Sequence, residues 1–333
     1  MEKRTLGPKG PAVSALGLGC MGMSDFYGPA DRGESIATIH AALDAGVTLL
    51  DTGDFYGSGH NEMLIGEALR GRRREEVFIA VKFGALRSPK GEFLGLDCRP
   101  AAVKNFLTCT LRRLGTDYVD LYQPARVDPA VPIEDTVGAI KEMAAAGYVR
   151  HIGLSEAGAD TLRRASAVHP IAWLQIEYSL LSRGIEAEIL PTARELGIAI
   201  AAYGVLSRGL LSGHWSADSV NGAQDFRAHQ PRFSGANLER NLALVEAVRE
   251  IAWERGASVA QFAIAWVLAQ GQDISPLIGA RRRDRLAEAL GAAPLRLSAN
   301  DLARLEAAVP AGAVAGYAAS QMALLDSERS RQA

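Results

Sequence analysis

The amino-acid sequence predicts an α/β protein: one (β/α)8 TIM barrel with an N-terminal hairpin and a C-terminal tail. Three observations support this class. Short apolar runs alternate with helical stretches along the chain, no linker interrupts the alternation, and the 333-residue length suits one α/β barrel. We assign residues 1–311 to the barrel and residues 312–333 to a tail that packs on the barrel or is partly disordered. A doubly wound open sheet, the alternative, usually has fewer strands.

Eight apolar runs are predicted to be the parallel strands. Each is rich in Val, Ile, Leu or Ala and is bounded by glycine or polar residues, as expected for strands buried on both faces. In chain order they cover residues 15–19, 47–51, 77–82, 118–122, 149–154, 173–177, 198–203 and 274–278.

Stretches of helical periodicity follow the strands, and three of them end at Gly46, Gly147 and Gly197, the residue type that favours helix C-termini. Asn61 is expected to cap a further helix after the second strand. The remaining predicted helices, including the three that end at glycine, cover residues 34–45, 100–114, 133–146, 160–168, 186–196, 238–255, 259–269 and 281–290.

Composition excludes several classes of protein. Lys and Arg total 36, Asp and Glu total 38, and the formal net charge is −2, so a nucleic-acid binder is not expected. No apolar run reaches the roughly 18 residues of a membrane helix, and the N-terminus lacks a secretory apolar core. Cys20, Cys98 and Cys109 form no C-x-x-C pair, which argues against a disulfide framework or metal site. We expect a cytoplasmic monomer or homo-oligomer.

Residues 17–22 spell G-x-G-x-x-G, the pattern of a dinucleotide-binding turn. Such a turn must open directly into a helix whose N-terminus holds the pyrophosphate. Residues 23–29, which contain two more turn formers, predict a loop instead. We therefore interpret the match as fortuitous.

The chemically informative residues fall where barrel enzymes keep their active sites, at the carboxyl ends of strands. Asp51 ends the second predicted strand, Tyr56 follows five residues later, and Lys82 ends the third. The ammonium group of Lys82 is expected to lower the pKa of Tyr56, so that the phenol can exchange a proton near neutral pH. A structural Asp–Lys pair with an incidental tyrosine is the alternative.

Several motifs resemble those of the aldo-keto reductases, in order and over almost the whole chain: residues 17–23, 51–57, 61–62, 81–84, 152–156, 174–180 and 207–209. The resemblance implies a (β/α)8 barrel, an NADP(H) cofactor, and interconversion of carbonyls and alcohols. It also implies a catalytic tetrad of Asp, Tyr, Lys and His. Three members map onto Asp51, Tyr56 and Lys82, with Tyr56 as the proton donor.

The fourth tetrad member has no counterpart, because Ala125 stands where the family typically has His. Alanine cannot polarise a substrate carbonyl. We hypothesise that Gln123, Arg126 or a water molecule orients the carbonyl instead. Among the six histidines, His151 begins a strand at the opposite barrel end, and His60 is an improbable replacement.

The resemblance also assigns cofactor contacts. Tyr203 is expected under the nicotinamide ring, while Ser155 and Gln175 hold its carboxamide and Glu156 stands where the family often has Asn. Residues 204–208 match the loop beside the pyrophosphate. The full set implied to contact NADP(H) is Met21, Asp51, Ser155, Gln175, Tyr203, Gly204, Leu206, Ser207, Arg208, Gly279, Arg281, Arg285 and Glu288.

Basic residues after the eighth strand favour NADPH over NADH. Residues 279–285 contain four arginines and open a predicted helix, so free backbone N–H groups and guanidinium groups can bind the adenosine 2′-phosphate. Arg281, Arg285 and Glu288 match the family pattern, but Ala289 replaces its usual Asn.

We therefore expect an NADPH-dependent oxidoreductase that reduces a small aldehyde or ketone, with neither nucleic acid nor membrane as a partner. Two alternatives remain: an NADP-binding regulatory protein with little turnover, and an alcohol or sugar dehydrogenase. Residues 207–237 form either a lid over the cofactor, with Trp215, Phe226 and Phe233 as contacts, or a packed surface excursion.

Overall fold

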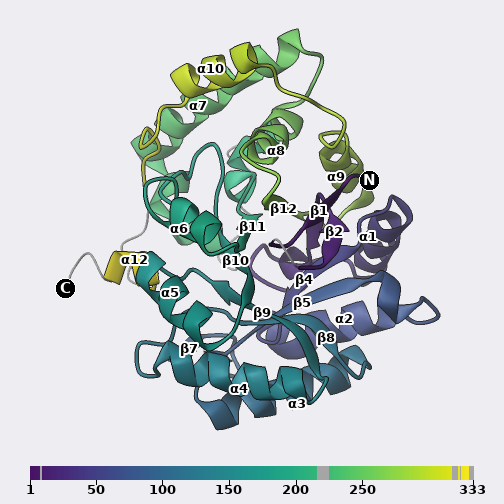
Figure 1. The fold of residues 1–333 in the computed structure, drawn as a ribbon. Helices are drawn as coiled ribbons and strands as arrows, with labels where there is room; N and C mark the ends of the chain where they lie inside the picture. Colours follow the sequence, from purple (N-terminus) through teal and green to yellow (C-terminus); the bar gives the residue numbers. More distant parts are fainter. Residues whose placement is uncertain (8–9, 216–224, 317–321, 323, 330–333) are drawn as a thin grey trace.

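A computed structural model describes the chain except residues 8–9, 216–224, 317–321, 323 and 330–333 (Figure 1). Eight parallel strands close into a barrel in the order β10-β11-β12-β3-β4-β5-β8-β9, which confirms the predicted (β/α)8 class. The barrel strands are β3 (Gly17–Gly19), β4 (Leu49–Gly53), β5 (Phe78–Phe83), β8 (Val119–Pro124), β9 (Val149–Ser155), β10 (Ile171–Glu177), β11 (Ala199–Tyr203) and β12 (Ile274–Gly279).

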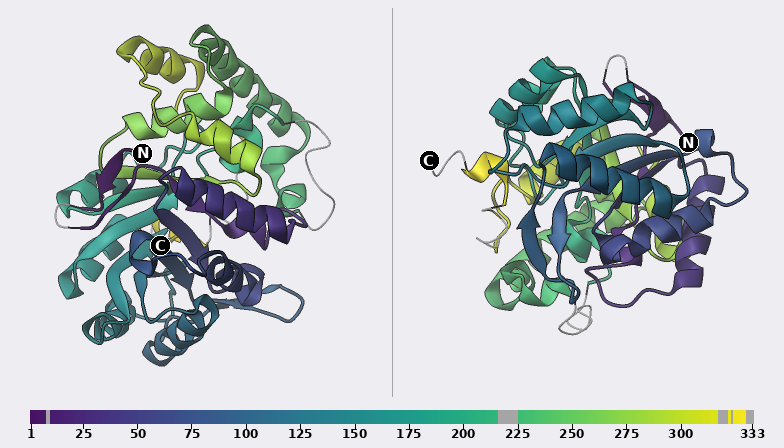
Figure 2. Two further views of the ribbon diagram at one scale, coloured as in Figure 1. Left: turned by 90° about the vertical axis from the view of Figure 1, so that its right-hand side faces the viewer. Right: turned by 90° about the horizontal axis from the view of Figure 1, so that it is seen from below.

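Helices surround the barrel, as the two further views in Figure 2 also show. The helices around the barrel are α1 (Arg32–Asp44), α2 (His60–Ala68), α3 (Pro100–Leu114), α4 (Ile133–Ala145), α5 (Ala159–Val168), α6 (Ile189–Glu195), α8 (Val259–Ala269) and α9 (Arg283–Leu290). Two further helices, α7 (Gly235–Glu254) and α10 (Ala299–Ala308), pack on each other (Figure 1). The sequence prediction missed α10, although Ser298 and Asp301 form a capping box at its start.

Two antiparallel hairpins lie at opposite ends of the barrel. The predicted N-terminal hairpin is present as β1 (Lys3–Thr5) and β2 (Ala12–Ser14). Its side chains Leu6 and Val13 pack on the barrel-interior residues Phe78 and Trp173 and close that end. The second hairpin, β6 (Ala85–Arg87) and β7 (Phe93–Leu96), was not predicted.

The G-x-G-x-x-G segment contributes to packing and does not open a helix. Gly17 and Gly19 lie in β3, the short 3-10 helix Met21–Met23 follows, and α1 begins only at Arg32. A Cβ on Gly17 would lie 2.7 Å from the side chains of Leu277 and Leu49 on the neighbouring strands. Close strand approach therefore explains this glycine.

We expect Gly17→Ala to destabilise the protein by about 1–3 kcal/mol, because the added methyl group overpacks the barrel wall. Gly138→Ala in α4 is the matched control: a Cβ there meets no atom within 4 Å. Because alanine is the better helix former, the control is expected to stabilise by about 0.5–1 kcal/mol. Urea denaturation of both variants measures the difference, and equal midpoints would contradict the packing argument.

Asn61 does not cap a helix, contrary to the sequence prediction. It lies inside α2, fully buried, and Gly59 occupies the cap position with a φ of 96°. The Asn61 amide accepts a hydrogen bond from the Thr52 hydroxyl (2.6 Å) and donates one to the Cys20 carbonyl (2.9 Å). This side chain therefore links the ends of β3 and β4.

The described part of the C-terminal segment packs on the barrel domain. The Asn241 side chain exchanges two hydrogen bonds with the backbone of Ala315, both 3.1 Å. The Gly158 N–H donates to Asp326 (2.9 Å), at the start of the short helix α12 (Asp326–Arg329), which lies beside α5 in Figure 1. No helix in the described ranges is long and apolar enough to cross a membrane.

Candidate active site

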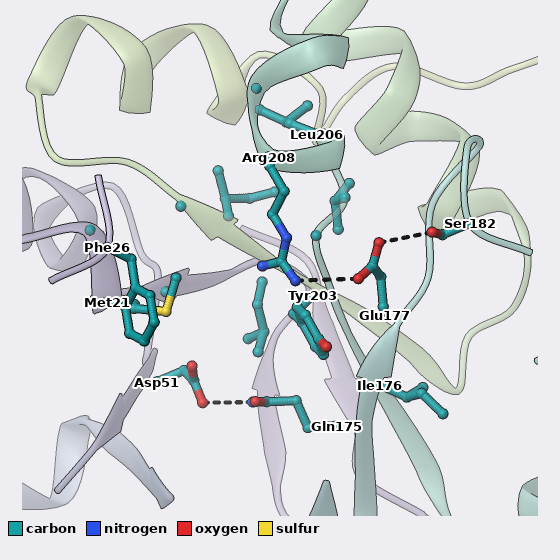
Figure 3. Close-up of a pocket in the computed structure, with 18 of the residues that line it drawn as sticks. Met21, Phe26, Asp51, Gln175, Ile176, Glu177, Ser182, Tyr203, Leu206 and Arg208 are labelled. Atoms are coloured by element: carbon teal, nitrogen blue, oxygen red, sulfur yellow. Dashed lines mark hydrogen bonds and ion pairs between the residues drawn. The ribbon is translucent and has the colours of Figure 1, made fainter. Parts of the chain in front are cut away.

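A cavity of about 1140 Å³ opens at the carboxyl ends of the barrel strands. Figure 3 shows side chains from several strands and loops converging on it. The implied catalytic residues Tyr56, Lys82 and Asp51 all line this cavity. So do the implied cofactor residues, except Ser155 and Ser207: Met21, Asp51, Gln175, Tyr203, Gly204, Leu206, Arg208, Gly279, Arg281, Arg285 and Glu288.

Asp51, Lys82 and Tyr56 form one cluster. Register pairing of β4 with β5 places Asp51 opposite Ala80, so that the longer Lys82 side chain can reach back to it. The Lys82 ammonium lies 2.7 Å from both Asp51 carboxylate oxygens and 5.2 Å from the centre of the Tyr56 ring. Both strands extend beyond their predicted ends: β4 continues two residues past Asp51, and β5 continues one residue past Lys82.

The pKa of Tyr56 shifts in the direction opposite to the sequence expectation. Burial raises the pKa of this phenol well above its usual range, and the Asp51 carboxylate raises it further, while Arg126 and Arg208 oppose the shift. The charge of Lys82 is balanced by Asp51 at 2.7 Å, which weakens its effect on the phenol. The raised pKa keeps the Tyr56 phenol protonated at neutral pH.

We expect Tyr56 to add no phenolate absorbance below about pH 10, the ordinary tyrosine value. A raised pKa favours the protonated phenol, so the donor form persists as the pH rises from neutrality. The measurement is an alkaline absorbance titration of the wild-type protein minus that of Tyr56→Phe. Extra phenolate in the wild type between neutrality and pH 10 would contradict the direction of the shift.

The ends of β9 and β10 offer polar groups that suit a carboxamide. Gln175 donates to Asp51 at 2.6 Å and lies opposite Ser155 in register. The Ser155 hydroxyl is buried and has no hydrogen-bond partner among the described residues. Glu156 lines the cavity, and its Oε1 accepts from the Glu177 N–H at 3.0 Å.

Arg208 covers the ring of Tyr203 at the end of β11 (Figure 3). Its guanidinium carbon lies 5.0 Å from the ring centre, and one nitrogen lies 3.2 Å from Glu177. Ser207, which the resemblance assigned to the cofactor, instead accepts a hydrogen bond from Arg232 (3.0 Å) and does not line the cavity.

The other end of the cavity is basic. Arg281, Arg285 and Glu288 line it together with His214, whose ring nitrogen lies 3.0 Å from Glu288. The predicted helix start is wrong by two residues. Helix α9 begins at Arg283, and Arg282 before it has an extended backbone.

Glu34 on α1 explains this helix start. It accepts hydrogen bonds from both the backbone N–H and the side chain of Arg283, and so caps the helix N-terminus. Arg281 itself donates to the carbonyl oxygens of Tyr27 (3.1 Å) and Pro29 (3.2 Å).

Gln123 and Arg126, which were both hypothesised to replace the missing histidine, differ in position because only Arg126 lines the cavity. Gln123 is fully buried behind the cavity wall, where its Oε1 accepts from the Trp173 indole at 2.7 Å. Ala125 and Arg126 both line the cavity. His60 is exposed and lies 2.8 Å from the Ser24 hydroxyl, away from the cavity lining.

Aromatic side chains surround the phenol of Tyr56. Phe55 and Phe26 contact it edge to face, at 4.7 and 6.3 Å between ring centres. Phe226 packs on Phe26 at 6.0 Å, and its backbone N–H donates to the Phe26 carbonyl. Phe26 and Phe55 are not among the predicted site residues, although Phe55 lies in the motif segment 51–57 and Phe26 in the loop 23–29.

The described parts of the segment 207–237 contribute to the wall of the cavity. Trp215 and Phe226, two of the three predicted contact residues, line the cavity. Phe233 does not: it is buried and packs on Trp215 in a tilted arrangement with 4.8 Å between ring centres. Residues 216–224 lie outside the described residues.

The chain is similar to known proteins over nearly its whole length. The model of the aldo/keto reductase family matches residues 15–310. A relative from Glycine max, "Probable aldo-keto reductase 1", is 43% identical over 312 residues, which are 93% of this chain and 90% of that protein.

Solved structures give the same result. The glycerol dehydrogenase AKR11B4 from Gluconobacter oxydans superposes with a TM-score of 0.83 at 29% identity, covering 92% of this chain and 94% of that one. The holo form of aldo-keto reductase AKR11C1 from Bacillus halodurans gives a TM-score of 0.76 at 27% identity, with 95% and 98% coverage.

Proposed function

Because this chain belongs to the aldo/keto reductase family, we propose that it is an NADPH-dependent enzyme that reduces an aldehyde or ketone to the alcohol, with Tyr56 as the proton donor. One observation carries the proposal. The buried phenol, the Lys82–Asp51 pair and a cluster of arginines line a single cavity at the carboxyl end of the barrel.

The residues of the cavity fit a nicotinamide dinucleotide phosphate. Gln175 lines the cavity and would turn its amide from Asp51 toward a carboxamide, and the buried Ser155 hydroxyl, which has no partner among the described residues, lies opposite it in register. The Tyr203 ring offers a stacking surface once Arg208 moves aside. A Cβ on Gly279 would meet no atom within 4 Å, so the backbone there is open to a ligand. Arg281 and Arg285 would hold the 2′-phosphate. When bound, the cofactor supplies the hydride.

The chain's own contribution is a positioned proton. Tyr56 donates its phenolic proton to the carbonyl oxygen as the carbon is reduced, and a phenolate remains. The Lys82 ammonium, 5.2 Å from the ring, stabilises that phenolate, while Asp51 holds Lys82 in place. Phe26 and Phe55 exclude water, which strengthens both electrostatic interactions.

Oxidation of an alcohol is the second candidate, because a structurally similar protein is a glycerol dehydrogenase. The same residues would act in reverse, with the Tyr56 phenolate accepting the alcohol proton. Its raised pKa keeps Tyr56 protonated at neutral pH, which is the form that reduction uses, whereas oxidation uses the phenolate.

The test is a comparison of both directions with the purified full-length protein. NADPH consumption is followed with aldehydes, ketones, quinones and keto sugars, and NADP⁺ reduction with the matching alcohols and glycerol. We expect faster turnover with the carbonyls at neutral pH. NADPH binding without turnover in either direction would favour a regulatory protein.

A further inference from the structure

Arg126 lies where the active site lacks its usual imidazole. It directly follows Ala125, whose backbone N–H donates to the Phe83 carbonyl (2.8 Å) next to Lys82. Ala125 is buried and presents only a methyl group to the cavity, so the neighbouring guanidinium is the polar group available there. One Arg126 nitrogen donates to the Ala125 carbonyl at 2.6 Å, and its Nε is buried with no partner among the described residues.

The other charged groups around Tyr56 are paired. Lys82 pairs with Asp51 at 2.7 Å, Arg87 with Asp25 at 2.8 Å, and Arg208 with Glu177 at 3.2 Å. Within the described part of the chain, Arg126 has no carboxylate within ion-pair distance. A cation in such a low-dielectric site is costly unless an anion compensates it.

Glu156 is the carboxyl group that interacts electrostatically with Arg126 from the cavity wall. No Glu156 oxygen lies within ion-pair distance of the Arg126 nitrogens in the described part of the chain. The Glu156 Oε1 instead accepts a hydrogen bond from the Glu177 N–H at 3.0 Å. Burial raises the pKa of Glu156, while the charge of Arg126 opposes that shift.

We propose that the substrate is a 2-oxo acid, whose carboxylate binds Arg126 while the adjacent carbonyl oxygen faces Tyr56. This inference rests on the proposed function and names its substrate class. Arginine recognises carboxylates through paired hydrogen bonds, and a carboxylate one bond from the carbonyl fits neighbouring binding groups. Phe26 and Phe55 border the same space and suit an apolar or aromatic group on the other side of the carbonyl.

The reaction balances without any further reactant. The 2-oxo carbon gains a hydride from NADPH, and its oxygen gains the Tyr56 proton, which gives a 2-hydroxy acid, NADP⁺ and a phenolate that solvent reprotonates. The carboxylate is unchanged. Arg126 thereby fixes the carbonyl's orientation through the neighbouring carboxylate, which replaces the orienting role of the absent imidazole.

The test compares phenylglyoxylate with its methyl ester, which differ in the anionic group beside one carbonyl. We expect kcat/KM of the wild-type enzyme with NADPH to be about 10–100-fold higher for the acid, as expected for hydrogen bonds to a charged group. Arg126→Met should remove this preference by lowering the acid value and leaving the ester value nearly unchanged. Arg126→Lys, which keeps the charge, should retain part of the preference.

Arg87→Met is the matched control, because Arg87 lines the same cavity but is already paired with Asp25. It should leave the acid-to-ester ratio unchanged. Glu156→Gln should increase that ratio, since it removes the remaining competing carboxyl group. An equal loss for both substrates in Arg126→Met would overturn the inference, as would a wild-type enzyme that reduces the ester as well as the acid.

Benzaldehyde, which has a carbonyl but no carboxylate, distinguishes a failure of the 2-oxo acid inference from a failure of the proposed function. If the wild type reduces benzaldehyde in a Tyr56-dependent way but shows no preference for the acid, the substrate class is wrong and the proposed function stands. If no carbonyl compound oxidises NADPH, the proposed function fails and the inference fails with it. If an Arg126 variant does not fold, the wild-type ratio of kcat/KM for phenylglyoxylate to kcat/KM for its methyl ester decides the substrate class by itself.

Discussion

Tyr56→Phe is expected to abolish carbonyl reduction while leaving NADPH affinity almost unchanged. The substitution removes one oxygen and keeps the ring that packs on Phe55 and Phe26. Loss of a positioned general acid typically lowers the rate by about 10²–10⁴-fold. No other phenol lies beside the Lys82–Asp51 pair in the described residues, so no neighbour can deliver the proton from the same position.

The measurement combines steady-state NADPH consumption with a fluorescence titration of NADPH binding. Tyr122→Phe is the matched control, because the Tyr122 hydroxyl donates to the Val103 carbonyl (3.3 Å) outside the cavity. It should lose about 1 kcal/mol of stability and keep its turnover. Turnover of Tyr56→Phe close to the wild-type rate would show that another group donates the proton.

Replacing Arg281 and Arg285 together by alanine is expected to weaken NADPH binding and to leave NADH binding nearly unchanged. Both side chains line the basic end of the cavity, and only NADPH carries the 2′-phosphate. Hydrogen bonds to charged groups contribute about 1.5–3 kcal/mol each, and less where the side chain is exposed, as Arg285 is. We expect the Kd for NADPH to rise by about 10–100-fold.

Arg283→Ala is the control for a general loss of positive charge. Arg283 lies between the two replaced residues, at the start of α9, but pairs with Glu34 at 2.9 Å and does not line the cavity. Binding of both cofactors should be the same in this variant as in the wild type. If the double variant lost NADH and NADPH affinity equally, the phosphate would have to bind elsewhere.

Most of the fold could be predicted from the sequence because strands and helices of a barrel are encoded by local periodicity. The elements that were not predicted, the hairpin β6–β7 and helix α10, also have local causes. The hairpin β6–β7 is short, and its Phe93 and Leu94 side chains are exposed, so its pattern does not resemble a buried strand. Helix α10 follows the last βα unit, where the repeat no longer predicts an element.

The site was predictable to the level of residue position. Parallel barrel strands bring their carboxyl ends together, so Asp51, Lys82 and Gln175 had to meet near one another once the strands were identified. Their electrostatics were not predictable in the same way. The direction of the Tyr56 pKa depends on how deeply the phenol is buried and on which partner neutralises Lys82.

The sequence alone determined the order of the βα units, the end of the barrel at which the candidate site residues gather, and the presence of Ala125 in place of a histidine. The tertiary structure alone decided which side chains pair. In the folded chain Gln123 accepts a hydrogen bond from Trp173, Arg87 pairs with Asp25, and Arg126 has no carboxylate within ion-pair distance among the described residues. The physical reason is that periodicity reports which face of an element is buried, whereas the partner of a charged side chain is set by groups from distant segments.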